Sequence, residues 1–253
     1  MHQFARTELL IGLAGVDRLK DSKVAIYGVG GVGSYAVEAL ARAGIGHLIL
    51  VDFDEICLTN INRQLGALHS TVGRVKVDVL QERIQDINPA AQVTIYREFI
   101  TKENVESLIP DDCNYLVDAI DNITAKLALV QQAFSRGIPI IAAMGAGNRL
   151  DPGQLRIGDI SETSIDPLAR VMRRELKKRG IIKGLKVVYS REMPLKPLQT
   201  VMDCKSECIC PSGDAHCSVK RSIPGSISFV PPVAGMLMAS EVVRDLLADK
   251  KIS

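Results

Sequence analysis

A glycine-rich turn between a strand pattern and a helix pattern constrains this chain most. The apolar run 24–27 leads into Gly28-x-Gly30-x-x-Gly33, and helix-forming residues 34–43 follow at once. Gly28 permits a tight turn, Gly30 lets a phosphate approach the backbone, and Gly33 lets the helix pack closely on its strand. The free N–H groups of the first helical turn then face an anion. The pattern therefore predicts a nucleotide-binding βαβ unit.

An acidic residue completes this unit. A second apolar run, residues 48–51, ends at Asp52, nineteen residues after Gly33. A carboxylate at the end of the second strand accepts hydrogen bonds from the ribose hydroxyls of a bound nucleotide. Glycine-rich turns also serve plain α/β packing, but the order of strand, glycines, helix, strand and acid favours a nucleotide site.

Length and composition set the fold class. The chain has 253 residues, of which 47% are hydrophobic, so it can bury a full core without a metal or a disulfide. We expect one α/β, Rossmann-like domain over residues 1–253, with a mainly parallel sheet flanked by helices. Residues 1–150 would form the nucleotide-binding core. Residues 151–253 would form a C-terminal extension for substrate and dimer contacts, with a basic helix and a cysteine-bearing loop.

Charge and hydropathy narrow the classes of partner. No apolar run reaches the roughly 18 residues of a membrane span, and the first residues lack the basic segment and long apolar core of an export signal. We therefore expect a cytoplasmic protein with no membrane partner. The net charge is only +2, so any attraction for nucleic acid must come from local clusters of basic residues.

The segment after Asp52 is too rich in polar side chains for a simple connector. Residues 53–64 include Asn60, Arg63 and Gln64, and a helical pattern over residues 73–86 carries Lys76 in its first turn. A cation at a helix N-terminus is unfavourable unless an anion compensates it. Lys76 is therefore a candidate phosphate ligand. A capped loop without ligand contacts is the alternative for the 53–64 segment.

A third set of polar residues follows the buried strand predicted at residues 116–120. Asp118, Asp121 and Asn122 lie at its carboxyl end. Ligands of doubly wound sheets bind outside the carboxyl ends of the strands, so Asp121 should meet Asp52 on one rim. Asp121 is the predicted Mg²⁺ ligand, since Mg²⁺ is held by one or two carboxylates together with waters and phosphate oxygens. Its alternative role is the N-cap of the next helix.

These residues suit activation of a carboxylate by ATP. A dehydrogenase explains the glycines and Asp52, but it has no evident need for Arg63 and Lys76. Attack of a carboxylate on the α-phosphate concentrates negative charge, which fixed cations and Mg²⁺ stabilise. We therefore predict Asp121, Arg63 and Lys76 as the catalytic residues of an AMP-forming enzyme.

The C-terminal part begins with a basic helix. Asp166-Pro167 is a typical helix start, and residues 166–191 hold nine basic residues against two acidic ones. The basic face of this helix either binds RNA phosphates or is simply exposed to solvent. The predicted RNA-binding residues are Arg170, Arg173, Arg174, Lys177 and Lys178.

Four clustered cysteines follow, at Cys204, Cys208, Cys210 and Cys217. A structural metal site is one interpretation, but the irregular spacing does not favour it. A redox or thioester cysteine and a plain loop are the alternatives.

Two further segments have readable patterns. Residues 7–19 suggest a broken or short helical arm. Near the C-terminus we expect a strand at residues 226–230, a break at Pro231-Pro232 and a buried helix over residues 233–247.

Taken together, the motifs resemble the adenylation signature of the ubiquitin-activating-enzyme-like superfamily, which includes bacterial activators of sulfur-carrier proteins. The resemblance covers roughly residues 6–145. It implies that Asp121 binds Mg²⁺ and that Arg63 and Lys76 hold the phosphates of ATP. It also implies a homodimer in which Arg6 reaches the ATP of the neighbouring subunit. The expected ATP-site residues are Arg6, Gly28, Gly30, Gly33, Asp52, Asp54, Asn60, Arg63, Gln64, Lys76, Asp121 and Asn122.

The C-terminal part resembles one branch of that superfamily, the tRNA threonylcarbamoyladenosine dehydratases. The basic helix and the run 223–231 carry this likeness. It implies a threonylcarbamoyl-modified tRNA as substrate, whose carboxylate at adenosine 37 is activated as an acyl-adenylate and then cyclised. An adenylyltransferase for a ubiquitin-like sulfur carrier is the alternative, followed by an NAD-binding oxidoreductase or a nucleotide-sensing module. A sulfur-relay or accessory protein is a further expected partner.

Overall fold

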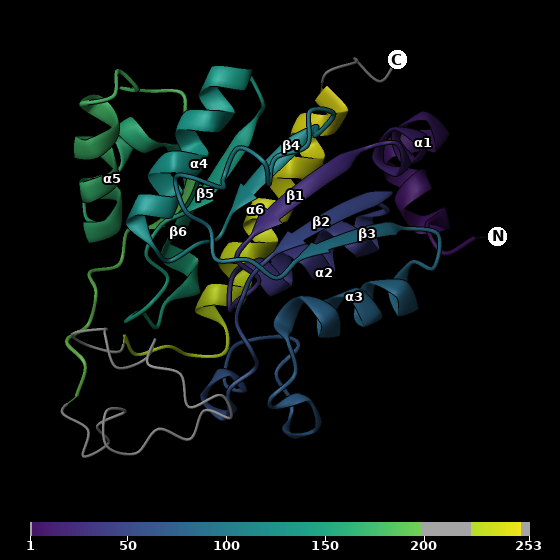
Figure 1. Cartoon of the computed structure of the whole chain (residues 1–253), viewed down its shortest axis with the longest axis horizontal. Coiled ribbons are helices and arrows are strands. Elements are labelled where there is room, and N and C mark those ends of the chain that lie inside the picture. The colour runs from purple at the N-terminus through teal and green to yellow at the C-terminus, as the bar shows by residue number, and fades with distance from the viewer. Residues whose placement is uncertain (1, 199–223, 249–253) are drawn as a thin grey trace.

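The computed structural model describes residues 2–198 and 224–248, and these residues build a seven-stranded sheet with helices on both faces (Figure 1). The strand order is β3-β2-β1-β4-β5-β7-β6, and neighbouring strands are parallel except for the antiparallel pair of β6 and β7. The strands are β1 (Lys23–Tyr27), β2 (His47–Val51), β3 (Gln92–Tyr96), β4 (Tyr115–Asp118), β5 (Ile140–Ala143), β6 (Leu155–Asp159) and β7 (Lys186–Ser190). The expected Rossmann-like, mainly parallel fold is confirmed.

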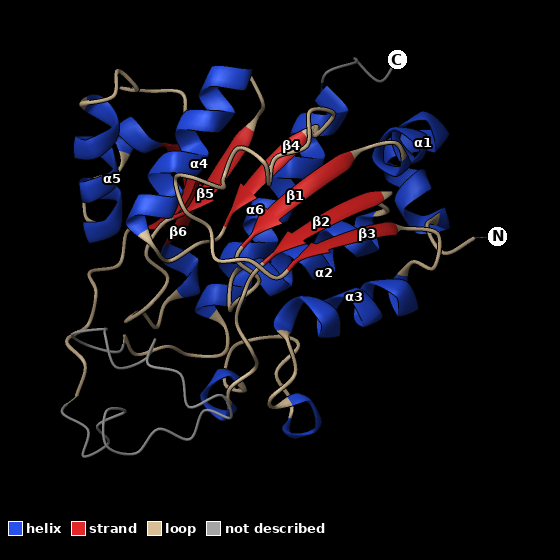
Figure 2. Ribbon diagram, in the orientation of Figure 1, coloured by secondary structure: helices blue, strands red, loops and turns tan. Residues whose placement is uncertain are grey.

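The helices cover the sheet in two layers. They are α1 (Ala5–Lys20), α2 (Gly33–Ala43), α3 (Lys76–Ile87), α4 (Ile123–Arg136), α5 (Pro167–Lys177) and α6 (Val230–Ala248). One apolar layer joins the sheet to α1, α2, α3 and α6, and the other joins it to α4, α5 and the segment 100–113 (Figure 2). The central strands β1, β2, β4 and β5 are almost entirely buried, as parallel strands covered on both faces must be.

The topology places a ligand site beside β1. The chain builds β1, β2 and β3 outward in one direction and then returns to β4 on the other side of β1. The loops that follow β1 and β4 therefore diverge at the carboxyl ends of the strands, where ligands of doubly wound sheets bind. The glycine-rich turn and Asp121 follow the carboxyl ends of β1 and β4, which are neighbouring strands.

The N-terminal helix is kinked, which confirms the expected broken arm. Gly12 in α1 has φ +70° and ψ 171°, values outside the helical region. Glycine tolerates this left-handed φ because it has no Cβ.

The C-terminal helix corrects one expectation. Residues 226–230 are not a strand, and Pro231 and Pro232 do not break the chain, because both lie in the first turn of α6. The N–H groups of a first turn have no helical partner, so proline costs nothing there. The buried helix predicted over residues 233–247 is confirmed and begins three residues earlier. Across the described ranges, none of the helices is both long and apolar enough to cross a bilayer.

Candidate nucleotide and substrate site

The three motif glycines have different geometric roles. Gly28 has φ +83°, and a Cβ there would lie 2.8 Å from the Ala119 carbonyl oxygen. A Cβ on Gly33 would lie 1.8 Å from the Gly28 carbonyl oxygen, so only glycine fits where α2 begins against β1. At Gly30 the nearest atom to such a Cβ is Gln64 Nε2, at 3.7 Å. Packing therefore requires Gly28 and Gly33, whereas Gly30 leaves its backbone approachable.

Asp52 fixes the glycine-rich turn to the end of β2. Its Oδ2 accepts the Val29 N–H at 2.7 Å, and its Oδ1 accepts the Asp54 N–H at 2.9 Å. The side chain is nearly buried, and this burial raises the pKa of Asp52, while the charge of Lys76 opposes the shift. Each carboxylate oxygen has a second lone pair, so the ribose-binding role remains a prediction that this geometry allows.

Lys76 and Asp54 form an ion pair at the same edge of the sheet. Lys76 is the first residue of α3, its side chain is buried, and its Nζ lies 2.6 Å from Asp54 Oδ2. The carboxylate compensates the cation that the helix N-terminus disfavours. A phosphate would have to share this ammonium with Asp54.

Arg63 and Gln64 approach the glycine-rich turn from the segment after β2, and Asn60 lies in the same segment. Arg63 Cγ lies 3.3 Å from the position of a Cβ on Gly31, and its Nη1 donates to the Thr59 carbonyl at 2.9 Å. Burial lowers the pKa of Arg63, but an arginine remains charged. Asn60 accepts the Cys57 N–H through its side chain and the Arg63 and Gln64 N–H groups through its carbonyl. Hydrogen bonds within this segment thus stabilise it, and Arg63 still presents a positive charge beside the glycine-rich turn.

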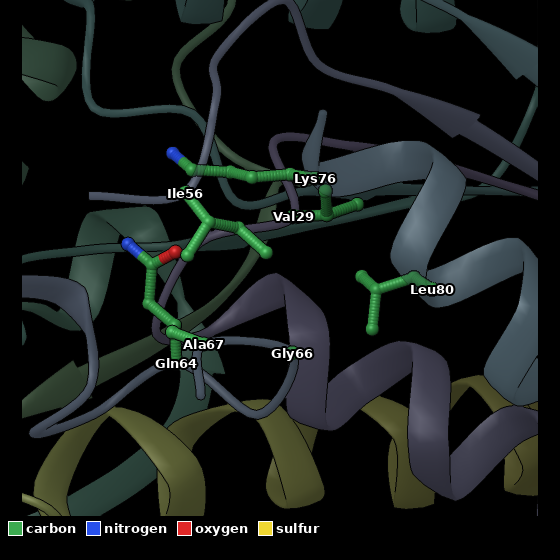
Figure 3. Close-up of a pocket in the computed structure, with 7 residues that line it drawn as sticks. All are labelled: Val29, Ile56, Gln64, Gly66, Ala67, Lys76 and Leu80. Atoms are coloured by element: carbon green, nitrogen blue, oxygen red, sulfur yellow. The ribbon is translucent and has the colours of Figure 1, made fainter. Parts of the chain in front are cut away.

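A small cavity separates α3 from this loop. Figure 3 shows Lys76 and Gln64, which come from different segments and extend toward the same side of the view. The cavity measures about 10 Å³, room for about one water molecule. A nucleotide would therefore lie on the open rim above it. The lining residues are Val29, Ile56, Gln64, Gly66, Ala67, Lys76 and Leu80.

The structure separates the roles of Asp121 and Asn122. Asn122 is the N-cap of α4, and its Oδ1 accepts the Ala125 N–H at 3.1 Å. The capping role considered for Asp121 therefore belongs to Asn122. Asp121 is exposed just after the carboxyl end of β4, and its role as a metal ligand stays a prediction.

A buried ion pair below this loop escaped sequence reasoning. Lys126 and Asp118 are both fully buried, and Lys126 Nζ lies 3.0 Å from Asp118 Oδ1 and 3.1 Å from the Ile120 carbonyl oxygen. Asp118 Oδ2 has no hydrogen-bond partner among the described residues. Burial raises the pKa of Asp118, and Lys126 opposes the shift. The only signal in the sequence is a lysine within the otherwise apolar stretch 125–130.

An aromatic pair on the rim was also missed. Phe53 follows Asp52 directly, and its ring lies edge-on to that of Phe99, with ring centroids 4.9 Å apart. Both rings are partly exposed. They offer an apolar surface beside the expected ribose position.

Arg6 does not approach the rim of its own chain. It is exposed near the start of α1, and Figure 1 shows this helix beyond the amino ends of the strands. The neighbouring Gln3 donates to Asn88, which follows the C-terminus of α3. Any contact of Arg6 with ATP must therefore involve a second subunit.

The cysteine cluster at Cys204, Cys208, Cys210 and Cys217 lies outside the described residues. Within residues 2–198 and 224–248, no group of three or more His, Cys, Asp or Glu side chains could hold a metal ion.

Comparisons with known proteins give three results. The model of the ThiF family matches residues 4–253. The tRNA threonylcarbamoyladenosine dehydratase of Bacillus subtilis (strain 168) is 46% identical over 254 residues, which cover 100% of this chain and 97% of that protein. The protein of the same name from Escherichia coli (strain K12) is 39% identical over 202 residues, 77% of this chain and 75% of that protein.

Solved structures agree with this likeness. The E. coli tRNA N6-threonylcarbamoyladenosine dehydratase, TcdA, in complex with ATP superposes with a TM-score of 0.85 at 33% identity. The match covers 98% of this chain and 94% of that chain, and the complex with AMP gives the same values.

Proposed function

The chain belongs to the ThiF family, and we propose that it catalyses the ATP-dependent dehydration of N6-threonylcarbamoyladenosine at position 37 of tRNA. The observation that carries this proposal is the rim at the carboxyl ends of β1, β2 and β4. An approachable glycine-rich backbone, two cations and an exposed carboxylate come from the segments that follow these strands, which supports a nucleotide site there. The likeness to the B. subtilis dehydratase over the whole chain supports the choice of substrate.

The proposed reaction has two steps. An oxygen of the substrate carboxylate attacks the α-phosphorus of ATP, the O–P bond forms and pyrophosphate leaves. A nucleophile in the same threonylcarbamoyl group then attacks the activated carbonyl, the C–O bond breaks, and AMP leaves with the former carboxylate oxygen. Because both reactants of the second step belong to one side chain, proximity lowers its barrier, by about 7–11 kcal/mol at ideal alignment.

The side chains of this chain would stabilise the first step. Arg63 packs on the glycine-rich turn and Lys76 lies at the N-terminus of α3, so both cations would neutralise charge that develops on the phosphates. Asp52 would hold the ribose, and the Phe53–Phe99 pair would contact the adenine.

Mg²⁺ fits this arrangement. An ion bound mainly by phosphate oxygens and water needs only one or two carboxylates from the protein, and Asp121 is exposed where such an ion would lie. The ion would supply positive charge to the phosphates, and Asp121 would fix its position.

We also propose a homodimer built on α1. Leu9, Leu10 and Leu13 are 86%, 87% and 61% exposed on this helix. Apolar side chains grouped in this way mark a protein contact, and Arg6 lies on the same helix.

Mixing two inactive variants would test this arrangement. An Arg6→Ala subunit keeps Asp121, and an Asp121→Ala subunit keeps Arg6, so each mixed dimer would contain one complete site. Full subunit exchange should restore about a quarter of wild-type activity, since half the dimers are mixed and each has one active site of two. If the mixture stays inactive although the subunits exchange, Arg6 does not serve the partner's ATP.

The proposed activity has a direct assay. The protein is incubated with ATP, Mg²⁺ and threonylcarbamoyl-modified tRNA, and the nucleosides are analysed by mass spectrometry. We expect the modified adenosine to lose one water while AMP and pyrophosphate are released. An unchanged nucleoside would reject the proposal, and pyrophosphate exchange that depends on a small protein ending in Gly-Gly would point to a carrier-protein adenylyltransferase.

A further inference from the structure

An open pocket lies beside the basic helix α5. It measures about 360 Å³, and we call it the α5 pocket. Its lining residues are Ser161, Arg170, Arg173, Arg174, Lys177 and Ile182. Four of the six are cations and none is a carboxylate, so an anion is the favoured occupant.

Their contacts divide the basic residues of α5 and its C-cap into two groups. Arg170, Arg174 and Lys177 lie three or four residues apart and share one face of the helix, and all three are exposed. Lys178 points elsewhere, because its Nζ donates to Glu175 Oε1 at 2.8 Å.

Glu175 neutralises the second group. Hydrogen bonds from Lys178, and then from Arg174 and Arg179, lower the pKa of Glu175 to about 2. Lys178 and Arg179 thus share a carboxylate that does not line the α5 pocket. Arg174 contacts the same carboxylate through Nε at 3.1 Å while it also lines the pocket.

Arg173 differs from its neighbours. It is half-buried, and its Nη1 donates to the carbonyl oxygen and the hydroxyl of Thr163. Thr163 is buried at the end of the short helix η4 (Ile160–Glu162), which also supplies Ser161. Arg173 therefore fixes the wall of the α5 pocket.

A buried network ties α5 to the rim of the sheet. The fully buried Asp166 caps α5 at the Ala169 N–H and also accepts the Gly145 N–H, each at 3.0 Å. Arg149 Nη2 donates to the same carboxylate at 3.1 Å and is itself buried. Gly145 and Arg149 follow the carboxyl end of β5, so the start of α5 is fixed relative to this rim.

We infer that the α5 pocket binds one backbone phosphate of the tRNA, which Arg170, Arg174 and Lys177 contact directly. Arginine forks match the geometry of phosphate oxygens. Ile182, which is 65% exposed, would contact the adjoining ribose. Arg173 is a positioning residue and Lys178 makes no contact. The inference rests on the proposed tRNA substrate and refines the expectation that all five basic residues bind RNA.

Adjacent lysines give a matched test. Lys177→Gln and Lys178→Gln remove the same charge from neighbouring positions, but only Lys177 lines the pocket. We would measure the Kd of an unmodified tRNA transcript between low and moderate salt. Loss of one of the three cations at this phosphate should lower the salt slope by up to about 0.9 and raise the Kd by up to about fivefold near 0.15 M salt. Lys178→Gln should leave both values nearly unchanged.

The positioning role of Arg173 has its own readout. Arg173→Lys keeps the charge but removes the guanidinium whose Nη1 donates to Thr163. It should lower the melting temperature and weaken RNA binding, with a salt slope close to that of the wild type. Weakened RNA binding with an unchanged melting temperature would make Arg173 a direct phosphate ligand instead.

The outcomes separate this inference from the proposed function. Equal effects of the two lysine variants would overturn the α5 pocket, even if the wild type cyclises its substrate. Displacement of the tRNA by polyglutamate at equal charge concentration would also overturn it, because the pocket would then favour acidic peptides. If the wild type binds tRNA through Lys177 but never cyclises it, the inference stands and the proposed reaction fails.

Discussion

Replacing Lys126 by methionine should remove about 3–5 kcal/mol from the free energy of unfolding. The ammonium lies 3.0 Å from Asp118 Oδ1, and neither side chain is exposed to solvent. Without it, the Ile120 N–H at 3.1 Å is the one hydrogen-bond donor to that carboxylate among the described residues. In the variant, the buried Asp118 carboxylate would have neither hydration water nor a counterion.

The loss is large enough to measure by thermal unfolding. For a chain of this size, about 1 kcal/mol corresponds to roughly 2–4 °C in Tm, so Lys126→Met should lower Tm by about 6–20 °C. Denaturation in urea should show the same loss with an unchanged slope, since the fold is retained.

The stability loss caused by Lys126→Met should also depend on pH. Burial raises the pKa of Asp118, and without Lys126 it rises further. Above about pH 3.9 the unfolded carboxyl has lost its proton, whereas the native carboxyl keeps it up to the raised pKa. The native state then binds more protons, so stability falls as pH rises through this window. The Tm difference from the wild type should therefore be smaller at pH 5 than at pH 8.

A double-mutant cycle provides the control. Asp118→Asn combined with Lys126→Met removes both charges, so the combined loss should be smaller than the sum of the single losses by about 1–3 kcal/mol. Additive losses, or a Lys126→Met penalty below about 1 kcal/mol, would refute the view that this pair is a coupled buried unit.

Three further predictions concern the sheet rim and its helices. Gly33→Ala should prevent stable folding, because the added carbon would lie 1.8 Å from a main-chain oxygen, whereas Gly30→Ala should melt like the wild type and weaken ATP binding in calorimetry. Although burial opposes the shift, hydrogen bonds from two arginines lower the pKa of Glu38. Glu38→Gln should therefore cost stability at pH 7, and the difference should vanish as pH falls through the lowered pKa; a constant difference would contradict this. Asp121→Ala should abolish AMP formation while largely preserving the fold, and retained activity would show that the metal ligand is another residue.

Local sequence order was sufficient to predict the nucleotide-binding half of the fold. Glycines before a helix, an acid after the second strand and a capped start for α5 are each encoded within a few residues. Asp166, for example, caps α5 as its position before proline indicates. Such features depend little on distant partners.

Features that depend on distant contacts could not be predicted in the same way. Pro231 and Pro232 predicted a break in the chain, because the sequence does not show that α6 begins at Val230. The Lys126–Asp118 pair shows its role only once both side chains are buried together. Lys177 and Lys178 are alike in sequence, and only the position of Glu175 distinguishes them.

The central claim is that a substrate carboxylate is joined to AMP on the rim of the sheet. A single turnover with tRNA whose threonylcarbamoyl carboxylate carries a heavy oxygen isotope tests it directly. We predict AMP that contains one labelled oxygen, with one pyrophosphate released for each adenosine cyclised. Unlabelled AMP, or release of ADP and phosphate, would contradict the claim.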